Sequence, residues 1–328
     1  MINKKSKFFL TILITALLTL VACGDSEDDT KDQDNTSKGN NEEATESYVV
    51  EHAMGETTIK GTPKRIVVLT NHGTEALLSL GIKPVGAVQS WVGDPWYDHI
   101  ADQMEGVQVV GTESSISLEQ IAALEPDLIL ANKQRQEEHY ESLNAIAPTV
   151  YEEALRGDWK INFELIAEAV NKKEEGEQVL AEYQARVDEI RNKLEEANLL
   201  DTEVSLVRFL PSDVRIYWKD TFSGIILDEI GLKRPEAQDI DDFAAMGVTM
   251  ERINEMDGDV IFYFTYNPEG EDGYATTNQW VESDLWKNLS AVQAGKAYEV
   301  DDTIWNTAGG VIAAKLMLDD LESKLLNE

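Results

Sequence analysis

The stretch SLEQIAALEPDLILA, residues 117–131, recurs later in the chain as TMERINEMDGDVIFY, residues 249–263. The two stretches align without a gap, and Ser117 and Thr249 both stand where a helix N-cap is expected. Each copy has the pattern of a capped helix, a chain-breaking turn and a buried strand. The repetition predicts an α/β fold built from two related lobes.

Candidate strands alternate with helical patterns along both halves of the chain. In the first half they are 65–69, 84–88, 108–110 and 127–131, and in the second half 203–209, 214–217 and 297–300. Between the halves, residues 173–197 carry apolar side chains at helical spacing, which gives one apolar stripe on a helix of about 37 Å. The stripe consists of Val179, Tyr183, Val187, Ile190 and Leu194. We expect this helix to be a stiff connector between the lobes.

The first 22 residues have the order of parts of a secretory signal peptide. Three lysines precede an apolar run of 15 residues at 8–22, whereas a membrane-spanning helix needs roughly 20. Cys23 is the only cysteine, and LVAC at 20–23 fits the bacterial lipobox, in which the thiol is alkylated by a diacylglycerol before cleavage. We therefore expect Cys23 to be the lipidated first residue of a protein anchored to the extracytoplasmic face of the cell membrane.

Acidic residues dominate the chain, with 62 Asp and Glu against 28 Lys and Arg and a formal net charge of −34. Residues 24–47 hold nine acids, two lysines and no aromatic residue, so they cannot bury enough apolar surface to fold. We expect a disordered tether there. Charge of this sign and size excludes nucleic acid as a partner and leaves the lipid as the contact with the membrane. The chain is expected to act as a monomer.

These patterns predict five segments. They are a signal peptide at 1–22, a lipidated N-terminus with a disordered tether at 23–47, an N-terminal α/β lobe at 48–160, a connector helical region at 161–200 and a C-terminal α/β lobe at 201–328.

Five stretches, taken in this order, resemble the substrate-binding lipoproteins of bacterial ABC importers that capture ferric siderophores, haem and cobalamin. They are PKRIVVL (63–69), LGIKPVGA (80–87), SLEQI with EPDLI (117–121 and 125–129), IAPTV (146–150) and IWNTAGG (304–310). The resemblance implies a ligand cleft between two lobes, a single connector helix, no cofactor and delivery of the cargo to ABC permease subunits. Residues 204–217 and 219–224 look most like receptors for ferric siderophores built on citrate, with hydroxamate or carboxylate arms.

Candidate ligand-binding residues lie at or near strand ends, where open α/β sheets bind their ligands. They are Asn71, His72, Trp91 and Arg135 in the N-terminal lobe, and Arg208, Arg215, Tyr217 and Trp305 in the C-terminal lobe. Arginine makes bidentate contacts to carboxylate or hydroxamate oxygens, and Trp and Tyr supply rigid walls with a polar edge. Each also has a structural alternative, because arginines can pair with the many acids and aromatic side chains beside strands can belong to the core. Thr265 and Tyr266 also follow a strand, and Trp159 is a candidate for packing between the lobes.

Three other functions fit parts of the pattern. Direct capture of a metal ion would favour several clustered ligands, but the four histidines stand in different segments without paired spacing. Haem or another chelated metal is an alternative ligand within the same importer class, and haem would take His72 or a tyrosine such as Tyr217 as axial ligand. A lipid-anchored hydrolase is the alternative from another class, but the chain has no G-x-S-x-G, HExxH, CxxC or Gly-rich phosphate loop. We expect a binding protein and not an enzyme.

Overall fold

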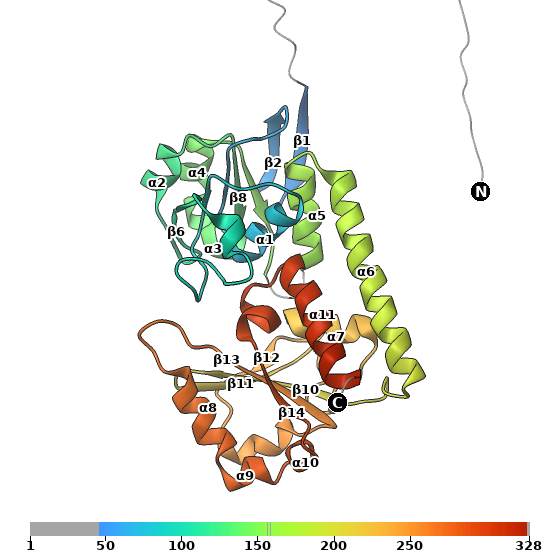
Figure 1. The fold of residues 1–328 in the computed structure, drawn as a ribbon. Coiled ribbons are helices and arrows are strands. Elements are labelled where there is room, and N and C mark those ends of the chain that lie inside the picture. Colours follow the sequence, from blue (N-terminus) through green and yellow to red (C-terminus); the bar gives the residue numbers. More distant parts are fainter. Residues whose placement is uncertain (1–45, 156, 158, 327–328) are drawn as a thin grey trace, which may run out of the picture. The chain divides into compact units, whose positions relative to one another are not determined.

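A five-stranded parallel sheet forms the centre of the N-terminal lobe (Figure 1). Its strands are β3 (Ile66–Val68), β4 (Gly86–Ala87), β5 (Gln108–Val109), β8 (Leu128–Asn132) and β9 (Thr149–Glu152), and the lobe's helices are α1 (Asn71–Ser79), α2 (Leu118–Ala123), α3 (Lys133–Gln136) and α4 (Tyr140–Ile146). The strand order is β5-β4-β3-β8-β9. Because both faces of such a sheet are covered, β3, β8 and β9 are buried at every residue.

The computed structural model describes residues 46–155, 157 and 159–326, which belong to one compact unit, Ala44–Glu328. The predicted signal peptide, Cys23 and the tether up to residue 45 lie outside the described residues. The lobe begins with the antiparallel hairpin of β1 (Ser47–His52) and β2 (Gly55–Lys60), and a second, short hairpin joins β6 (Gly111–Thr112) to β7 (Ser115–Ile116). No helix of the described part is long and apolar enough to cross a bilayer.

A second five-stranded sheet forms the centre of the C-terminal lobe. Its strands are β10 (Val204–Leu210), β11 (Asp213–Tyr217), β12 (Ala244–Ala245), β13 (Val260–Thr265) and β14 (Ala297–Val300), and its helices are α7 (Phe222–Ile230), α8 (Gly273–Val281), α9 (Asp284–Lys287), α10 (Ser290–Gln293) and α11 (Val311–Leu326). The order is β12-β11-β10-β13-β14, with β10, β13 and β14 parallel and the β11 and β12 pairings antiparallel. The predicted two-lobed α/β fold is confirmed.

The strand of the repeated sequence unit is held in the same way in both lobes. The carboxylate of Asp127, just before β8, accepts hydrogen bonds from the backbone N–H groups of Lys64 and Arg65 at 2.8 and 2.9 Å. Asp259, just before β13, accepts one from the N–H of Glu203 at 2.9 Å. In each lobe the aspartate therefore ties the strand of the repeat to the first strand of its sheet.

The helical half of the repeat differs between the lobes. Ser117 caps α2 by accepting a hydrogen bond from the N–H of Gln120, as predicted. Thr249 makes no such bond, and the segment after it, Met250–Met256, is a 3₁₀ helix. The predicted helix is present there, but the prediction of its cap was wrong. A segment of about two turns has little intrinsic helical stability, so its packing decides its form.

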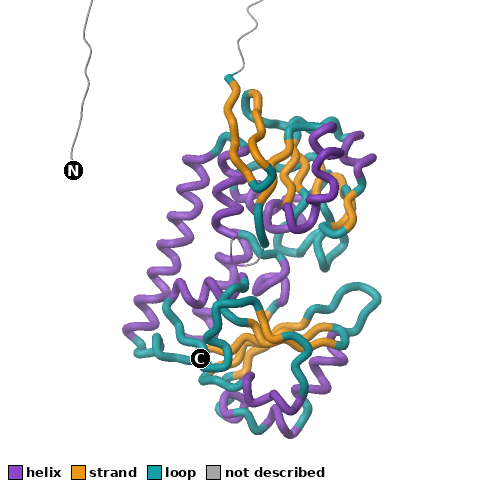
Figure 2. Tube along the Cα trace, turned by 180° about the vertical axis from the view of Figure 1, so that it is seen from behind, coloured by secondary structure: helices purple, strands orange, loops and turns teal. Residues whose placement is uncertain are grey.

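The predicted connector region holds two helices, α5 (Trp159–Ala169), which packs on α1 of the N-terminal lobe, and α6 (Lys173–Glu196), the one long helix that connects the lobes. In α6 the predicted stripe is buried at Tyr183, Val187, Ile190 and Leu194. At 1.5 Å per residue the helix is about 36 Å long, and in Figure 2 it runs past both sheets. One hydrophobic core contains residues of β3, α6, α7, β13 and α11, so the apolar interior continues from one lobe through the connector into the other.

Candidate functional site

A cavity of about 330 Å³ lies between the two lobes, with walls from both and from the start of the connector. The described residues that line it are His72, Trp91, Glu113 and Arg135 of the N-terminal lobe, Leu155, Trp159 and Asn162 near the connector, and Arg208, Leu210, Arg215, Tyr217, Thr221, Phe222, Phe243, Tyr266 and 306–309 of the C-terminal lobe. Cations, aromatic rings and one carboxylate dominate this list, which suits a polar or anionic ligand with flat surfaces.

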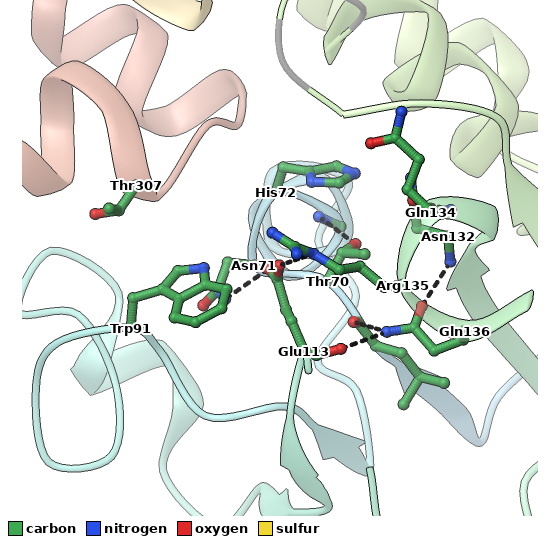
Figure 3. A network of polar contacts seen from close by, with 12 residues as sticks. Thr70, Asn71, His72, Trp91, Glu113, Asn132, Gln134, Arg135, Gln136 and Thr307 are labelled. Atoms are coloured by element: carbon green, nitrogen blue, oxygen red, sulfur yellow. Dashed lines mark hydrogen bonds and ion pairs between the residues drawn. The ribbon is translucent and has the colours of Figure 1, made fainter. Parts of the chain in front are cut away.

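The N-terminal wall consists of side chains that follow the parallel strands. His72 follows β3, Trp91 follows β4, Glu113 lies in the turn between β6 and β7, and Arg135 lies in α3 directly after β8. Because the carboxyl ends of parallel strands meet at one edge of a sheet, these four distant positions face the same cavity. Figure 3 shows them together with Thr307 of the other lobe.

Glu113 holds this wall in place. Its residue is only 5% exposed, and Oε1 accepts hydrogen bonds of 2.7 Å from both the backbone N–H and the side-chain amide of Asn71. Oε2 lies 3.6 Å from Nε of Arg135, and the guanidinium of Arg135 stacks over the Trp91 ring at 5.6 Å from its centroid. A buried carboxylate and an indole therefore fix the direction of a half-exposed arginine (Figure 3).

His72 is a further cation of the wall, held by a carboxylate. Its Nε2 lies 2.8 Å from both oxygens of Glu152, whose carboxylate also accepts a hydrogen bond from Asn132. Burial alone lowers the pKa of His72, but the carboxylates of Glu152, Glu113 and Glu75 outweigh burial and raise the pKa above its ordinary value. The imidazole consequently keeps its positive charge to higher pH than a free histidine does.

Arg208 is the most enclosed cation of the cavity. Nε and Nη2 donate to the two oxygens of Asp302 at 2.6 and 3.0 Å, Nη1 donates to the hydroxyl of Tyr217 at 3.0 Å, and the guanidinium lies 4.9 Å from the Tyr266 ring centroid. Burial alone would lower the pKa of Arg208, but the interactions with Tyr217 and Asp302 outweigh burial and raise the pKa above its ordinary value. Three of its five N–H donors are therefore used within the protein.

Arg215 has more donors available. Its Nε donates to Asp213 at 2.8 Å, and within the described part of the chain its two Nη groups have no hydrogen-bond partner. About a quarter of its side chain is exposed. Arg135 and Arg215 thus present terminal guanidinium groups from opposite lobes, whereas Arg208 is mainly bound inside its own lobe.

Trp159 begins α5 and closes the cavity at the connector. Its ring packs edge-on against Tyr183 at 5.0 Å and against Phe222 at 6.2 Å, so it joins connector and C-terminal lobe as the sequence predicted. It also lines the cavity, and its buried Nε1 has no hydrogen-bond partner among the described residues. Because that nitrogen is buried away from the open cavity, Trp159 contributes an aromatic wall to the cavity and not a hydrogen bond.

Two of the predicted site residues lie behind the walls. Asn71 is 3% exposed and bonds Glu113, so it supports Arg135 from inside the lobe. Trp305 is fully buried, its ring lies 4.5 Å from that of Phe262, and its Nε1 donates to Asp320. The cavity is lined at that point by residues 306–309. His72, Trp91, Arg135, Arg208, Arg215 and Tyr217 are all brought to the cavity.

Sequence reasoning missed Glu113, Phe243 and the 306–309 segment, and it gave Tyr266 no weight. Glu113 could have been found, because it follows the third strand of the parallel sheet just as His72 and Arg135 follow theirs. The described residues contain no cluster of three or more His, Cys, Asp or Glu side chains placed to hold a metal ion.

Comparisons with known proteins agree with this geometry. The family model described as periplasmic binding protein matches residues 66–303. The probable siderophore-binding lipoprotein YfiY of Bacillus subtilis (strain 168) is 49% identical, covering 98% of this chain and 99% of its own length, and the Fe(3+)-citrate-binding protein YfmC of the same strain is 29% identical, covering 97% and 96%. The structure of Staphylococcus aureus SirA complexed with staphyloferrin B has a TM-score of 0.79 and 34% identity, covering 85% of this chain and 98% of that chain. The predicted resemblance is confirmed, and the chain belongs to the periplasmic binding protein family.

Proposed function

We propose that this protein binds a ferric siderophore of the citrate-based type, with hydroxamate or carboxylate arms, and delivers it to the permease of an ABC importer for iron uptake. The observation that carries the proposal is the convergence of Arg135, Arg208, Arg215 and His72 on one cavity, each paired with a carboxylate of the protein. The names of the relatives YfiY, YfmC and SirA support the same class of ligand.

The carboxylate partners fix the direction of the cavity's cations in a chain of charge −34. Arg215 is tied through Nε to Asp213, and Arg135 lies beside Glu113. Their outer N–H groups therefore keep a fixed direction, and little rotamer freedom is lost when the ligand binds. A ferric siderophore needs such donors around its outer oxygens, because the chelator already fills the coordination shell of iron. The protein then contributes hydrogen bonds and aromatic walls and no bond to the metal.

This arrangement favours a siderophore over haem and binding over catalysis. Both oxygens of Glu152 engage Nε2 of His72, and Tyr217 accepts a hydrogen bond from Arg208, so both proposed axial ligands are already engaged. The carboxylates near the cavity serve as partners of cations, and the family is one of binding proteins. We infer that the chain is not an enzyme.

Native mass spectrometry on the purified protein tests the ligand class. After incubation with a mixture of ferric siderophores, iron-free siderophores and haem, we expect one iron-loaded, anionic siderophore per chain to be retained. Retention of haem in preference to every siderophore, or no retained ligand at all, would contradict the proposal. The outcome also identifies which siderophore is preferred.

We further propose that Cys23 carries the lipid that anchors the protein to the outer face of the cell membrane, beside its permease. The LVAC motif and the name of the relative YfiY, a lipoprotein, support this. Two or more acyl chains anchor a protein durably, so Cys23→Ala should release the protein into the soluble fraction without changing its siderophore affinity. Fractionation with an immunoblot measures this, and undiminished membrane association of the variant would refute the anchor.

A further inference from the structure

A buried carboxylate outside the cavity joins the two lobes. Glu75, in the middle of α1 of the N-terminal lobe, has a relative exposure of 0%. Its Oε2 accepts hydrogen bonds from the backbone N–H groups of Ile312 and Ala313 at 3.0 and 2.9 Å. These are the second and third residues of α11, a helix of the C-terminal lobe. A side chain of one lobe therefore caps a helix of the other.

The contact suits a charged carboxylate. The first N–H groups of a helix have no intrahelical partner, and the helix dipole places partial positive charge there. The approach is also close, since a Cβ built on Gly310 would lie 2.5 Å from Oε2 and 2.7 Å from Cβ of Glu75. Glycine at 310 is thus required for α1 and α11 to come together at this point.

Residues 97 and 99 extend the contact to the rim of the cavity. Nε2 of His99 lies 2.5 Å from Oε1 of Glu75, and the His99 ring stacks on Tyr97 with centroids 5.7 Å apart. The hydroxyl of Tyr97 donates to the backbone carbonyl of Thr307 at 3.0 Å. Thr307 lines the cavity in the C-terminal lobe, whereas Tyr97 and His99 belong to the N-terminal lobe.

We infer that Glu75 is a positioning residue, which together with His99, Tyr97 and the N-terminus of α11 forms an inter-lobe latch that sets the width of the empty cavity. Glu75 does not line the cavity, so it acts through the distance between Arg135 on one side and Arg208 and Arg215 on the other. α6 ties the two lobes together along one side. The lobes could still rotate relative to each other about that line of contact, and the latch restrains this rotation. The effect on affinity rests on the proposed function, but the effect on lobe spacing does not.

Distances between spin labels on the two lobes test the latch without any ligand. In the full chain with Cys23→Ser, labels at Glu119→Cys of α2 and Asn288→Cys at the end of α9 occupy exposed positions of opposite lobes. We expect a narrow distance distribution for the parent. Glu75→Gln keeps the shape of the side chain but removes its charge, and it should broaden the distribution of the empty protein. His99→Gln should broaden it less, because the bonds to α11 remain.

The matched control is Glu322→Gln on the same helix. Glu322 is a partly buried carboxylate that pairs with Arg186 and Lys193 of α6, away from α1. Glu322→Gln should leave the distribution of distances between the spin labels as narrow as in the parent. Unchanged widths in folded Glu75→Gln and His99→Gln, or equal broadening in Glu322→Gln, would overturn the latch. If Glu75→Gln fails to fold, the comparison of His99→Gln with Glu322→Gln decides.

Ligand binding gives a second readout. If the binding-competent spacing falls to about a tenth of the population, the apparent affinity falls about 10-fold. The siderophore identified by mass spectrometry should restore the parent's narrow distribution in Glu75→Gln, which a locally misfolded variant would not do. If the parent protein bound no siderophore, the proposed function would be refuted, but the distance measurement on the empty protein would still test the latch.

Discussion

Replacing Arg208 with alanine should destabilise the fold by about 3–5 kcal/mol, in addition to weakening ligand binding. The reason is the burial of its partner, since Asp302 is 6% exposed, burial raises its pKa above the ordinary value, and it would lose the two bonds from Nε and Nη2 that favour its charged form. The hydroxyl of Tyr217 would lose its donor as well. Urea unfolding followed by circular dichroism measures the loss, and a loss below about 1 kcal/mol, typical of exposed pairs, would contradict this reading.

A double substitution separates the structural role of Arg208 from its charge. Arg208→Met with Asp302→Leu removes both members of the pair, so no uncompensated charge stays buried, and most of the stability should return. Ligand binding should stay weak in the same variant, because the cation is still absent. Lys233→Ala, which removes a surface pair with Asp201, is the control and should leave the unfolding midpoint unchanged.

Unlike the loss of Arg208, replacement of Arg135 or Arg215 with alanine should strongly reduce the affinity for the ligand and change the stability of the fold little. Each offers charge-assisted hydrogen bonds worth roughly 1.5–3 kcal/mol, so each alanine variant should bind about 10- to 100-fold more weakly. Because the two residues stand in different lobes and share no partner in the described contacts, their effects should add, giving about 10²- to 10⁴-fold in the double variant.

Isothermal titration with the preferred ferric siderophore measures these losses. Arg186→Ala is the matched control, because this arginine of α6 pairs with Asp319 and Glu322 far from the cavity. It should bind like the parent. Folded single variants of Arg135 and Arg215 that both retain the parent's affinity would show that the ligand is held by other groups, and a neutral ligand would then fit better.

Much of the fold followed from the sequence because its signals are local. β14 begins and ends at the predicted residues, 297 and 300, and four of the five residues in the predicted stripe of α6 are buried. The aspartates of the repeat each bind the neighbouring strand. The 3₁₀ helix after Thr249 could not be predicted, because in such a short segment tertiary packing outweighs a capping signal.

The site was only partly predictable, since position after a strand selects an edge of the sheet but not the direction of a side chain. The arginines were found in this way, yet the same rule selected Trp305, whose indole faces Phe262 and Asp320 in the core. The carboxylates that orient the cations are harder to find. Asp302 is 94 residues from Arg208 along the chain, and Glu75 is 237 residues from its partner in α11, so only the fold brings them together.

The central claim is that the cavity holds an anionic ferric siderophore by its outward-facing arginines, and a tryptophan fluorescence titration tests it most directly. Trp91 and Trp159 line the cavity, so a bound iron complex should quench them. With ferric staphyloferrin B or ferric citrate, the ligands named for relatives, we predict saturable quenching at one complex per chain in the parent and its loss in Arg135→Ala/Arg215→Ala. Equal quenching in the parent and the double variant, or no saturable quenching by any ferric siderophore, would contradict the account.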